Sequence, residues 1–278
     1  MNQFLSPSTI DEALTYLKEK QDLRILAGGT DLIISIKDRS VTCAHLMDVK
    51  QISALQRVER TRDGLEIGAA VSLSTLLESD LLGGWYRAIA QSAASVANVL
   101  LRNRATLVGN ICTASPAGDM LPSCLVTHAM LHSISPNGER VIPLRDFFVG
   151  VKEHVLEPDE MATKIVIPHE DGVSAFRKKK RIRGHDLAQV SVAASYSRGG
   201  VLHMAFGAAT PTPLLIELGS TPSGMLRAQR DEIVDAALKH ATPISDVRSS
   251  KEYRLGMLKH LANEVLDEIL EEMGESSV

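Results

Sequence analysis

The chain has 278 residues, of which 44% are hydrophobic, and its 30 Lys and Arg face 34 Asp and Glu for a net charge of -4. This composition predicts roughly two or three modest domains with a substantial core, and the acidic balance argues against a broad nucleic-acid-binding surface. The N-terminal segment does not have the basic and apolar regions of a signal peptide, and no apolar run approaches the ~20 residues of a membrane span. We therefore expect a cytoplasmic protein without a membrane span that does not bind nucleic acid.

The first half of the chain predicts short alternating helices and strands. Ser8 is the expected N-cap of a helix that continues to Lys20. Ser72 is expected to cap a short helix. A long run of small and apolar residues predicts a single helix over 86–103. Buried strands are predicted over 23–27, 44–49 and 64–71.

The second half predicts a change of architecture near residue 170. A hairpin-like turn is expected at 135–140 and a strand at 164–168. Beyond the shift in composition, two strands over 188–197 and 201–209 are separated by Gly199 and Gly200, which is a hairpin signal, and a long helix is predicted over 249–273. Because helices and strands interleave without a regular βαβ repeat, the sequence favours an α+β fold.

Two glycine-containing loops suggest a bound anion. They are "LAGGTD" at Leu26–Asp31 and "TLVGN" at Thr106–Asn110. Glycine lets the backbone approach a ligand closely, and consecutive N–H groups can converge on a phosphate. Neither loop has the Rossmann or P-loop pattern. Spacing alone does not join the two loops, and each one taken alone is also compatible with an ordinary tight turn.

The order of several motifs resembles the FAD-binding medium subunit of the molybdenum hydroxylases, the xanthine dehydrogenase and carbon monoxide dehydrogenase type. The family carries an "AGGTDL" loop followed by "RNxATxGGNIxxASPxxDxxP". This chain reads "AGGTDL" at Ala27–Leu32 and "RNRATLVGNICTASPAGDMLP" at Arg102–Pro122. Further matches are "DEMATKIVIP" at Asp159–Pro168, "FRKKKRIRGHDLAQVSVA" at Phe176–Ala193, "FGAATPTP" at Phe206–Pro213 and "PISDVRSSKEYRLGMLKHL" at Pro243–Leu261.

The resemblance implies a fold and a domain division. It implies a two-lobed FAD-binding domain of the vanillyl-alcohol-oxidase type over residues 1–170, with lobes of about 1–55 and 56–170. It also implies a C-terminal domain over 171–278, built from a small antiparallel sheet and helices.

The resemblance also implies which residues hold FAD. Ile25 to Leu32 would wrap the pyrophosphate and part of the flavin through backbone N–H groups, and Thr106 to Asn110 would close on the other side. Asp119 would accept hydrogen bonds from the adenosine ribose. A helix cap is the alternative role for Asp119. The full implied set is Ile25, Leu26, Ala27, Gly28, Gly29, Thr30, Asp31, Leu32, Thr106, Val108, Gly109, Asn110, Asp119, Ala162 and Lys178.

Two of these positions, Val108 and Lys178, each have an alternative interpretation. Val108 stands where the family has glycine, and a β-branched residue does not easily adopt a positive φ. We expect this position to be extended in the fold, the alternative being an altered loop that binds FAD more weakly. Lys178 falls near the family's lysine at the flavin edge, and Arg177 is the alternative register.

The function implied is electron transfer by FAD. In such complexes the substrate is hydroxylated at a molybdopterin centre in a large subunit, and electrons pass through 2Fe–2S clusters in another subunit to FAD and then to NAD+ or another acceptor. No catalytic acid–base pair is expected in this chain. The alternatives are a self-contained flavin oxidase or dehydrogenase acting on a small molecule, and a nucleotide-binding scaffold protein without a redox role.

Other conspicuous residues suggest no further chemistry. His128 and His132 are four residues apart but have no third ligand, so no metal site is predicted. The basic run at Lys178–Arg183 is expected to neutralise phosphate or reduced flavin locally rather than to bind nucleic acid. The three cysteines, none of them in a C-x-x-C pair, are too few for an iron–sulfur cluster and are expected to be small buried residues.

Overall fold

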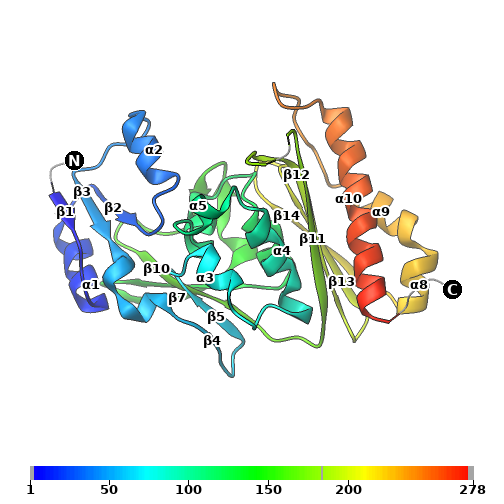
Figure 1. Ribbon diagram of the computed structural model, residues 1–278, viewed down its shortest axis with the longest axis horizontal. Coiled ribbons are helices and arrows are strands. Elements are labelled where there is room, and N and C mark those ends of the chain that lie inside the picture. Colours follow the sequence, from blue (N-terminus) through cyan, green and yellow to red (C-terminus); the bar gives the residue numbers. More distant parts are fainter. Residues whose placement is uncertain (1–2, 183, 275–278) are drawn as a thin grey trace.

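A computed structural model describes residues 3–182 and 184–274 of the chain. Figure 1 shows a small sheet with helix α1 (Ile10–Glu19) at one end and a larger sheet in the middle. At the other end lies a third sheet that is covered on its outer side by α9 (Arg230–Leu238) and α10 (Lys251–Glu272). Among the described residues, no helix combines the length and apolar character needed to cross a membrane. The mixed α+β architecture agrees with the sequence prediction.

The first sheet is parallel, in the order β1-β3-β2, and shares a core with α1. The predicted cap of this helix is wrong by one residue. Thr9, not Ser8, accepts the N–H of Glu12 at 3.2 Å, while the Ser8 N–H donates to the Glu12 carboxylate at 2.7 Å. The two bonds together form a reciprocal cap that fixes the start of α1. The strands are β1 (Gln3–Leu5), β2 (Leu23–Leu26) and β3 (His45–Asp48).

The middle sheet is antiparallel, in the order β4-β5-β10-β6-β7. The predicted hairpin at 135–140 is confirmed, because β6 and β7 pair up to Ser135 and Gly138 at their turn. A separate small hairpin, β8 (Phe148–Gly150) with β9 (Glu153–His154), follows it. The strands of the middle sheet are β4 (Val58–Arg60), β5 (Leu65–Gly68), β6 (Met130–Ser135), β7 (Gly138–Pro143) and β10 (Met161–Ile167).

The long helix predicted over 86–103 is interrupted. Helix α4 (Arg87–Ser95) ends before Ala97, whose φ of +43° is incompatible with a continuing right-handed helix. Asn98 then caps a second short helix, α5 (Val99–Arg102), by accepting the Leu101 N–H at 3.0 Å. The break turns the chain toward the second glycine-containing segment. The other short helices are α2 (Leu32–Lys37), α3 (Leu73–Leu77), α6 (Leu107–Thr113), α7 (Met120–Val126) and α8 (Ser223–Ala228).

The third sheet is antiparallel and has helices on both faces. Helix α10 packs against β11 and β12 on one side, and α4 and α7 pack on the other. Every residue of β12 is buried, which explains its continuous run of small and apolar residues. The predicted hairpin at Gly199–Gly200 is confirmed, with Gly200 at a φ of +85°. The strands are β11 (Gly172–Lys180), β12 (Ala188–Ser197), β13 (Val201–Gly207) and β14 (Leu214–Ser220).

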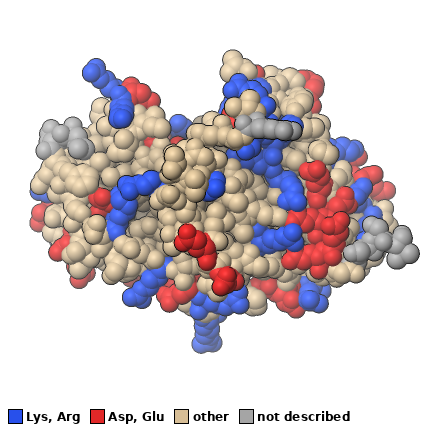
Figure 2. All heavy atoms as spheres, viewed as in Figure 1, with Lys and Arg blue, Asp and Glu red and all other residues tan. Residues whose placement is uncertain are grey.

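An ionic cluster joins α4, β11 and α10. Glu268 on α10 is buried and pairs with Arg87 at 2.7 Å and with Arg177 at 2.5 Å. Gln91 donates to Glu268 at 2.5 Å and accepts the Phe176 N–H at 2.7 Å, which satisfies a backbone donor on the edge strand of the sheet. Figure 2 shows acidic side chains gathered over α10, with basic side chains next to them. The cluster fixes β11 between α4 and α10.

His128 and His132, which are four residues apart, do not share a helix face. His128 follows α7 and His132 lies in β6. No group of three or more His, Cys, Asp or Glu residues suited to a metal ion occurs within residues 3–182 and 184–274. The partner of His128 is instead His203 on β13, with ring centroids 4.4 Å apart in an edge-to-face arrangement.

This histidine pair predicts a pH-dependent stability. Partial burial lowers the pKa of both His128 and His203, and the facing charges are Glu217, Arg145 and Glu170. An unfolded histidine titrates near pH 6.5, so stability is complete above that value and is lost as the pH falls through the lowered folded pKa. We expect the variant His203→Gln to lose less stability than wild type between about pH 7.5 and about pH 5.5 in urea unfolding. The variant His240→Gln, at an exposed position, serves as the control, and an equal effect there would contradict the assignment.

Candidate functional site

The first glycine loop lies against the backbone just before the second glycine-containing segment. The first glycine loop, Ala27–Asp31, follows β2, and its Gly28 lies directly against the backbone at Arg104 and Ala105. A Cβ atom at Gly28 would lie 2.2 Å from the Arg104 carbonyl oxygen, so only glycine permits this approach. Gly29 has a φ of +73°, which turns the chain into α2. The contact between the segments could not be deduced from their spacing in the sequence.

The first glycine loop has open backbone donors. Ile25 and Leu26 lie in β2 and Leu32 begins α2, which leaves the residues between them outside regular structure. Within the described parts of the chain, no hydrogen bond is donated by the N–H groups of Gly28, Gly29 and Thr30. The loop is only partly buried. Neighbouring N–H groups without protein partners on a partly exposed loop form an anion-binding surface.

The second glycine segment, Thr106–Asn110, is the start of a helix rather than an open loop. Thr106 caps α6 by accepting the Gly109 N–H at 2.9 Å. Val108 lies inside α6 and is 3% exposed, so the expectation of an extended conformation there is wrong. A helical position needs no positive φ, and valine occupies it without strain. The departure from the glycine pattern therefore gives no reason to expect a distorted segment.

Three hydrogen bonds hold the segment between α6 and α7. The Asn110 side-chain oxygen accepts the Met120 N–H at 3.2 Å. The Ala114 carbonyl accepts from the Lys152 N–H at 3.0 Å, and the Pro116 carbonyl accepts from the Ala208 N–H at 2.7 Å. The last bond links this segment to the end of β13 in the third sheet. The stretch is thereby fixed although it contains several turn-forming residues.

Asp119 does not cap α7. It stands at the N-cap position but its side chain makes no capping hydrogen bond. Its Oδ2 instead lies 2.6 Å from the Lys178 ammonium, and its Oδ1 is buried without a hydrogen-bond partner within the described residues. Burial raises the pKa of Asp119, and the Lys178 charge opposes part of that increase. The capping alternative is therefore wrong, and one buried carboxylate oxygen is left without a hydrogen-bond partner among the described residues.

Lys178 and Arg177, the two alternatives on β11, have different partners. Lys178 is 3% exposed and reaches Asp119 and the Ser95 carbonyl, the latter at 3.4 Å. Arg177 pairs with Glu268 on α10. Successive side chains of a strand point to opposite faces, so the two side chains face different surroundings. Arg183, the last residue of the basic run, lies outside the described residues.

Ala162 lies in β10, which packs against α6, and is 8% exposed. The printed contacts join the predicted residues in two groups: Gly28 lies against the Arg104 and Ala105 backbone just before α6, and Asp119 at the start of α7 pairs with Lys178 on β11. Sequence reasoning missed Lys50, whose ammonium donates to the Ala27 carbonyl at 3.0 Å. A lone lysine in a polar context gives no signal for such a contact.

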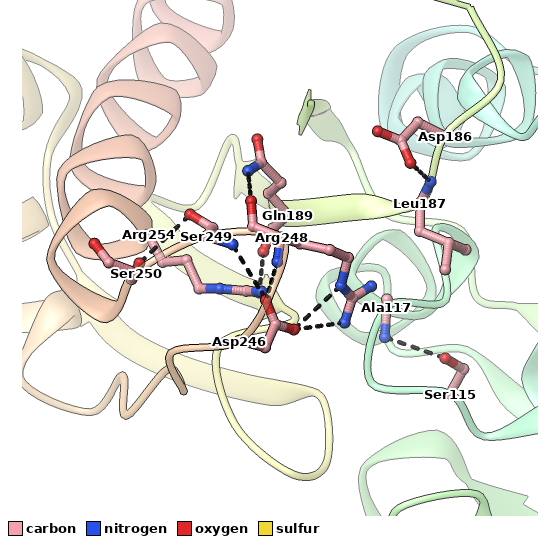
Figure 3. A network of polar contacts seen from close by, with 10 residues as sticks. All are labelled: Ser115, Ala117, Asp186, Leu187, Gln189, Asp246, Arg248, Ser249, Ser250 and Arg254. Atoms are coloured by element: carbon pink, nitrogen blue, oxygen red, sulfur yellow. Dashed lines mark hydrogen bonds and ion pairs between the residues drawn. The ribbon is translucent and has the colours of Figure 1, made fainter. Parts of the chain in front are cut away.

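A partly buried polar network lies at the start of β12. Figure 3 shows Asp246 between Arg248 and Arg254. Arg254 is 1% exposed, donates to the Gln189 carbonyl at 2.5 Å and reaches Asp246 at 2.8 Å, while Arg248 contacts Asp246 at 2.9 Å. Burial opposes ionisation of Asp246, but hydrogen bonds from both arginines hold its pKa well below its usual range. The network ties the segment before α10 to the start of β12.

Comparison with known proteins agrees with this geometry. Residues 1–170 match the family described as the FAD binding domain in molybdopterin dehydrogenase. The chain belongs to this family. The xanthine dehydrogenase FAD-binding subunit of Escherichia coli O157:H7 is 28% identical over 278 residues, covering 96% of this chain and 95% of that protein. The nicotinate dehydrogenase FAD-subunit of Eubacterium barkeri is 31% identical over 191 residues, covering 67% of this chain and 64% of that protein.

A solved structure shares the fold. Carbon monoxide dehydrogenase from Hydrogenophaga pseudoflava, in a form that lacks the Mo-pyranopterin moiety of the molybdenum cofactor, matches with a TM-score of 0.87 and 25% identity, over 97% of each chain. The chain is an FAD-binding oxidoreductase subunit of the molybdenum hydroxylase type, and FAD is its cofactor.

The described residues fit FAD. The first glycine loop offers N–H groups that have no protein partner, as a pyrophosphate requires. The buried Asp119 Oδ1 has no partner, as expected for an acceptor that is completed by a ribose hydroxyl. Lys178 keeps the carboxylate paired in the protein without FAD. These features belong to the chain itself and do not depend on the comparisons.

Proposed function

We propose that this chain carries electrons through FAD within a molybdenum hydroxylase complex, from iron–sulfur clusters of a partner subunit to NAD+ or another acceptor. FAD, when bound, supplies one- and two-electron redox chemistry. The chain's own residues bind and orient it. The observation that carries the proposal is the contact between Gly28 and the Arg104 backbone, which brings the first glycine loop against the chain just before α6.

Each part of the site has a distinct task in this proposal. The N–H groups of the first glycine loop hold the pyrophosphate, and the segment around α6 closes the opposite side. Asp119 accepts a hydrogen bond from a ribose hydroxyl through Oδ1. Lys178 opposes part of the increase that burial causes in the pKa of Asp119 and places one positive charge near the cofactor. None of these tasks requires a catalytic acid or base from this chain.

The proposed partners are a subunit with 2Fe–2S clusters and a large subunit with molybdopterin. Relatives are named as FAD-binding subunits or medium chains, which supports an assembly of several chains. The chain has only three cysteines, Cys43, Cys112 and Cys124, and all are free. A 2Fe–2S cluster is usually held by about four thiolates, so the clusters would have to come from another chain.

The test is the redox behaviour of the isolated chain. We expect the purified protein to bind FAD with a flavin absorbance spectrum that dithionite bleaches, while purines, aldehydes and N-heterocycles leave the spectrum unchanged. Adding the reduced iron–sulfur partner should bleach it. Bleaching by an organic substrate alone, at the rate of the whole complex, would contradict the proposal and favour a self-contained flavin oxidase. A folded chain that binds no FAD would favour a scaffold protein.

A further inference from the structure

Lys50 lies at the end of the first sheet, next to the start of the first glycine loop. It belongs to a 3₁₀ turn, Val49–Gln51, that follows β3 directly. Strands β2 and β3 run parallel, with Leu26 paired to Asp48. The residues that follow the two strands therefore leave the sheet at the same end. The end of β3 therefore sits beside the first residue of the loop.

The contacts of Lys50 are specific. Its ammonium donates to the Ala27 carbonyl at 3.0 Å and to the Asp48 carboxylate at 2.6 Å. Asp48 also accepts the Lys50 N–H at 3.0 Å, and the Gln56 side chain donates to the Lys50 carbonyl. The side chains of Lys50 and Asp48 are 26% and 15% exposed. Lys50 is therefore fixed at its backbone and at its charged end.

We propose that Lys50 is a positioning residue of the FAD site, an inference that rests on the proposed function. The first glycine loop is held from two sides, by Lys50 at Ala27 and by the close contact of Gly28 with the Arg104 backbone. A glycine pair is conformationally free, and holding its neighbour reduces the ordering that FAD binding would otherwise require. Asp48 balances the lysine charge, so Lys50 acts on the loop through its hydrogen bond to the Ala27 carbonyl.

The experiment is a titration of FAD into the apo forms of wild type, Lys50→Met and Lys50→Arg. We expect the dissociation constant to rise about tenfold in Lys50→Met, since a hydrogen bond to a charged donor is lost, and to return toward wild type in Lys50→Arg. Limited proteolysis of the apo proteins with a nonspecific protease gives a second readout, in which cleavage within Ala27–Asp31 should be faster in Lys50→Met while cleavage elsewhere is unchanged.

Lys259→Met is the matched control. Lys259 forms an ion pair of equal length with Asp235, 2.6 Å, far along the chain between α9 and α10. This variant should bind FAD like wild type. Equal FAD affinity of wild type and Lys50→Met, or an equal loss in Lys259→Met, would overturn the inference while leaving the proposed function intact. No FAD binding by folded wild type would instead overturn the proposed function.

Discussion

Replacing Gly28 by alanine is expected to weaken FAD binding by up to about a hundredfold, because overpacking of this kind costs about 1–3 kcal/mol. The added Cβ would lie 2.2 Å from the Arg104 carbonyl oxygen and 2.9 Å from the Ala105 Cα. Both are backbone atoms that cannot rotate away, so the two segments would have to separate. Separation moves the N–H groups of the first glycine loop away from the second segment, which disrupts the site for the pyrophosphate.

The measurement is an FAD titration of apo Gly28→Ala, with thermal unfolding of the same preparation. Gly256→Ala provides the control, because an added Cβ there, in α10, meets no atom within 4 Å. Alanine in a helix interior stabilises by roughly 0.5–1 kcal/mol over glycine, so this variant should be slightly more stable and should bind FAD normally. Wild-type affinity in folded Gly28→Ala would show that the contact between the segments is not needed for FAD.

Most of the helices and strands could be predicted from local sequence. Gly199 and Gly200 between two apolar runs predicted the β12–β13 hairpin, and the structure confirms it. The break between α4 and α5 could not be predicted, because alanine is a good helix former and yet Ala97 adopts a φ of +43°. Tertiary contacts override propensity where a chain must change direction, and this change leads into the site.

The candidate site was predictable only in part, and for a physical reason. Glycine at Gly29 and in the second segment signalled tight turns or an anion-binding loop, which are local properties. Their proximity depends on the parallel pairing of β2 with β3 and on the approach of Gly28 to Arg104, both of which are long-range. The ion pair of Asp119 with Lys178 spans 59 residues. No pattern of spacing within either segment contains that information.

Removing the Lys178 ammonium is expected to destabilise the apo protein by about 3–5 kcal/mol at neutral pH, because the variant Lys178→Met leaves a buried carboxylate without its cation. Lys178 is 3% exposed and Asp119 is 10% exposed, so water screens the pair little. Since burial already raises the pKa of Asp119, protonation of the carboxyl should reduce the loss as the pH falls. Urea unfolding of apo wild type and apo variant at neutral and mildly acidic pH measures this.

The double variant Asp119→Asn/Lys178→Met separates the structural role of the pair from its role toward FAD. Neither side chain is then charged, so most of the lost stability should return, because no unpaired charge remains buried. The FAD affinity of the double variant should stay below that of wild type. A ribose hydroxyl would donate to a neutral amide oxygen instead of the Oδ1 of a carboxylate, and the loss of the charge-assisted bond corresponds to about tenfold in the dissociation constant. Asp119→Asn alone should show the same loss of affinity. If the double variant regained both stability and affinity, Asp119 would serve only the ion pair, and the unpartnered Oδ1 would have no ligand in FAD.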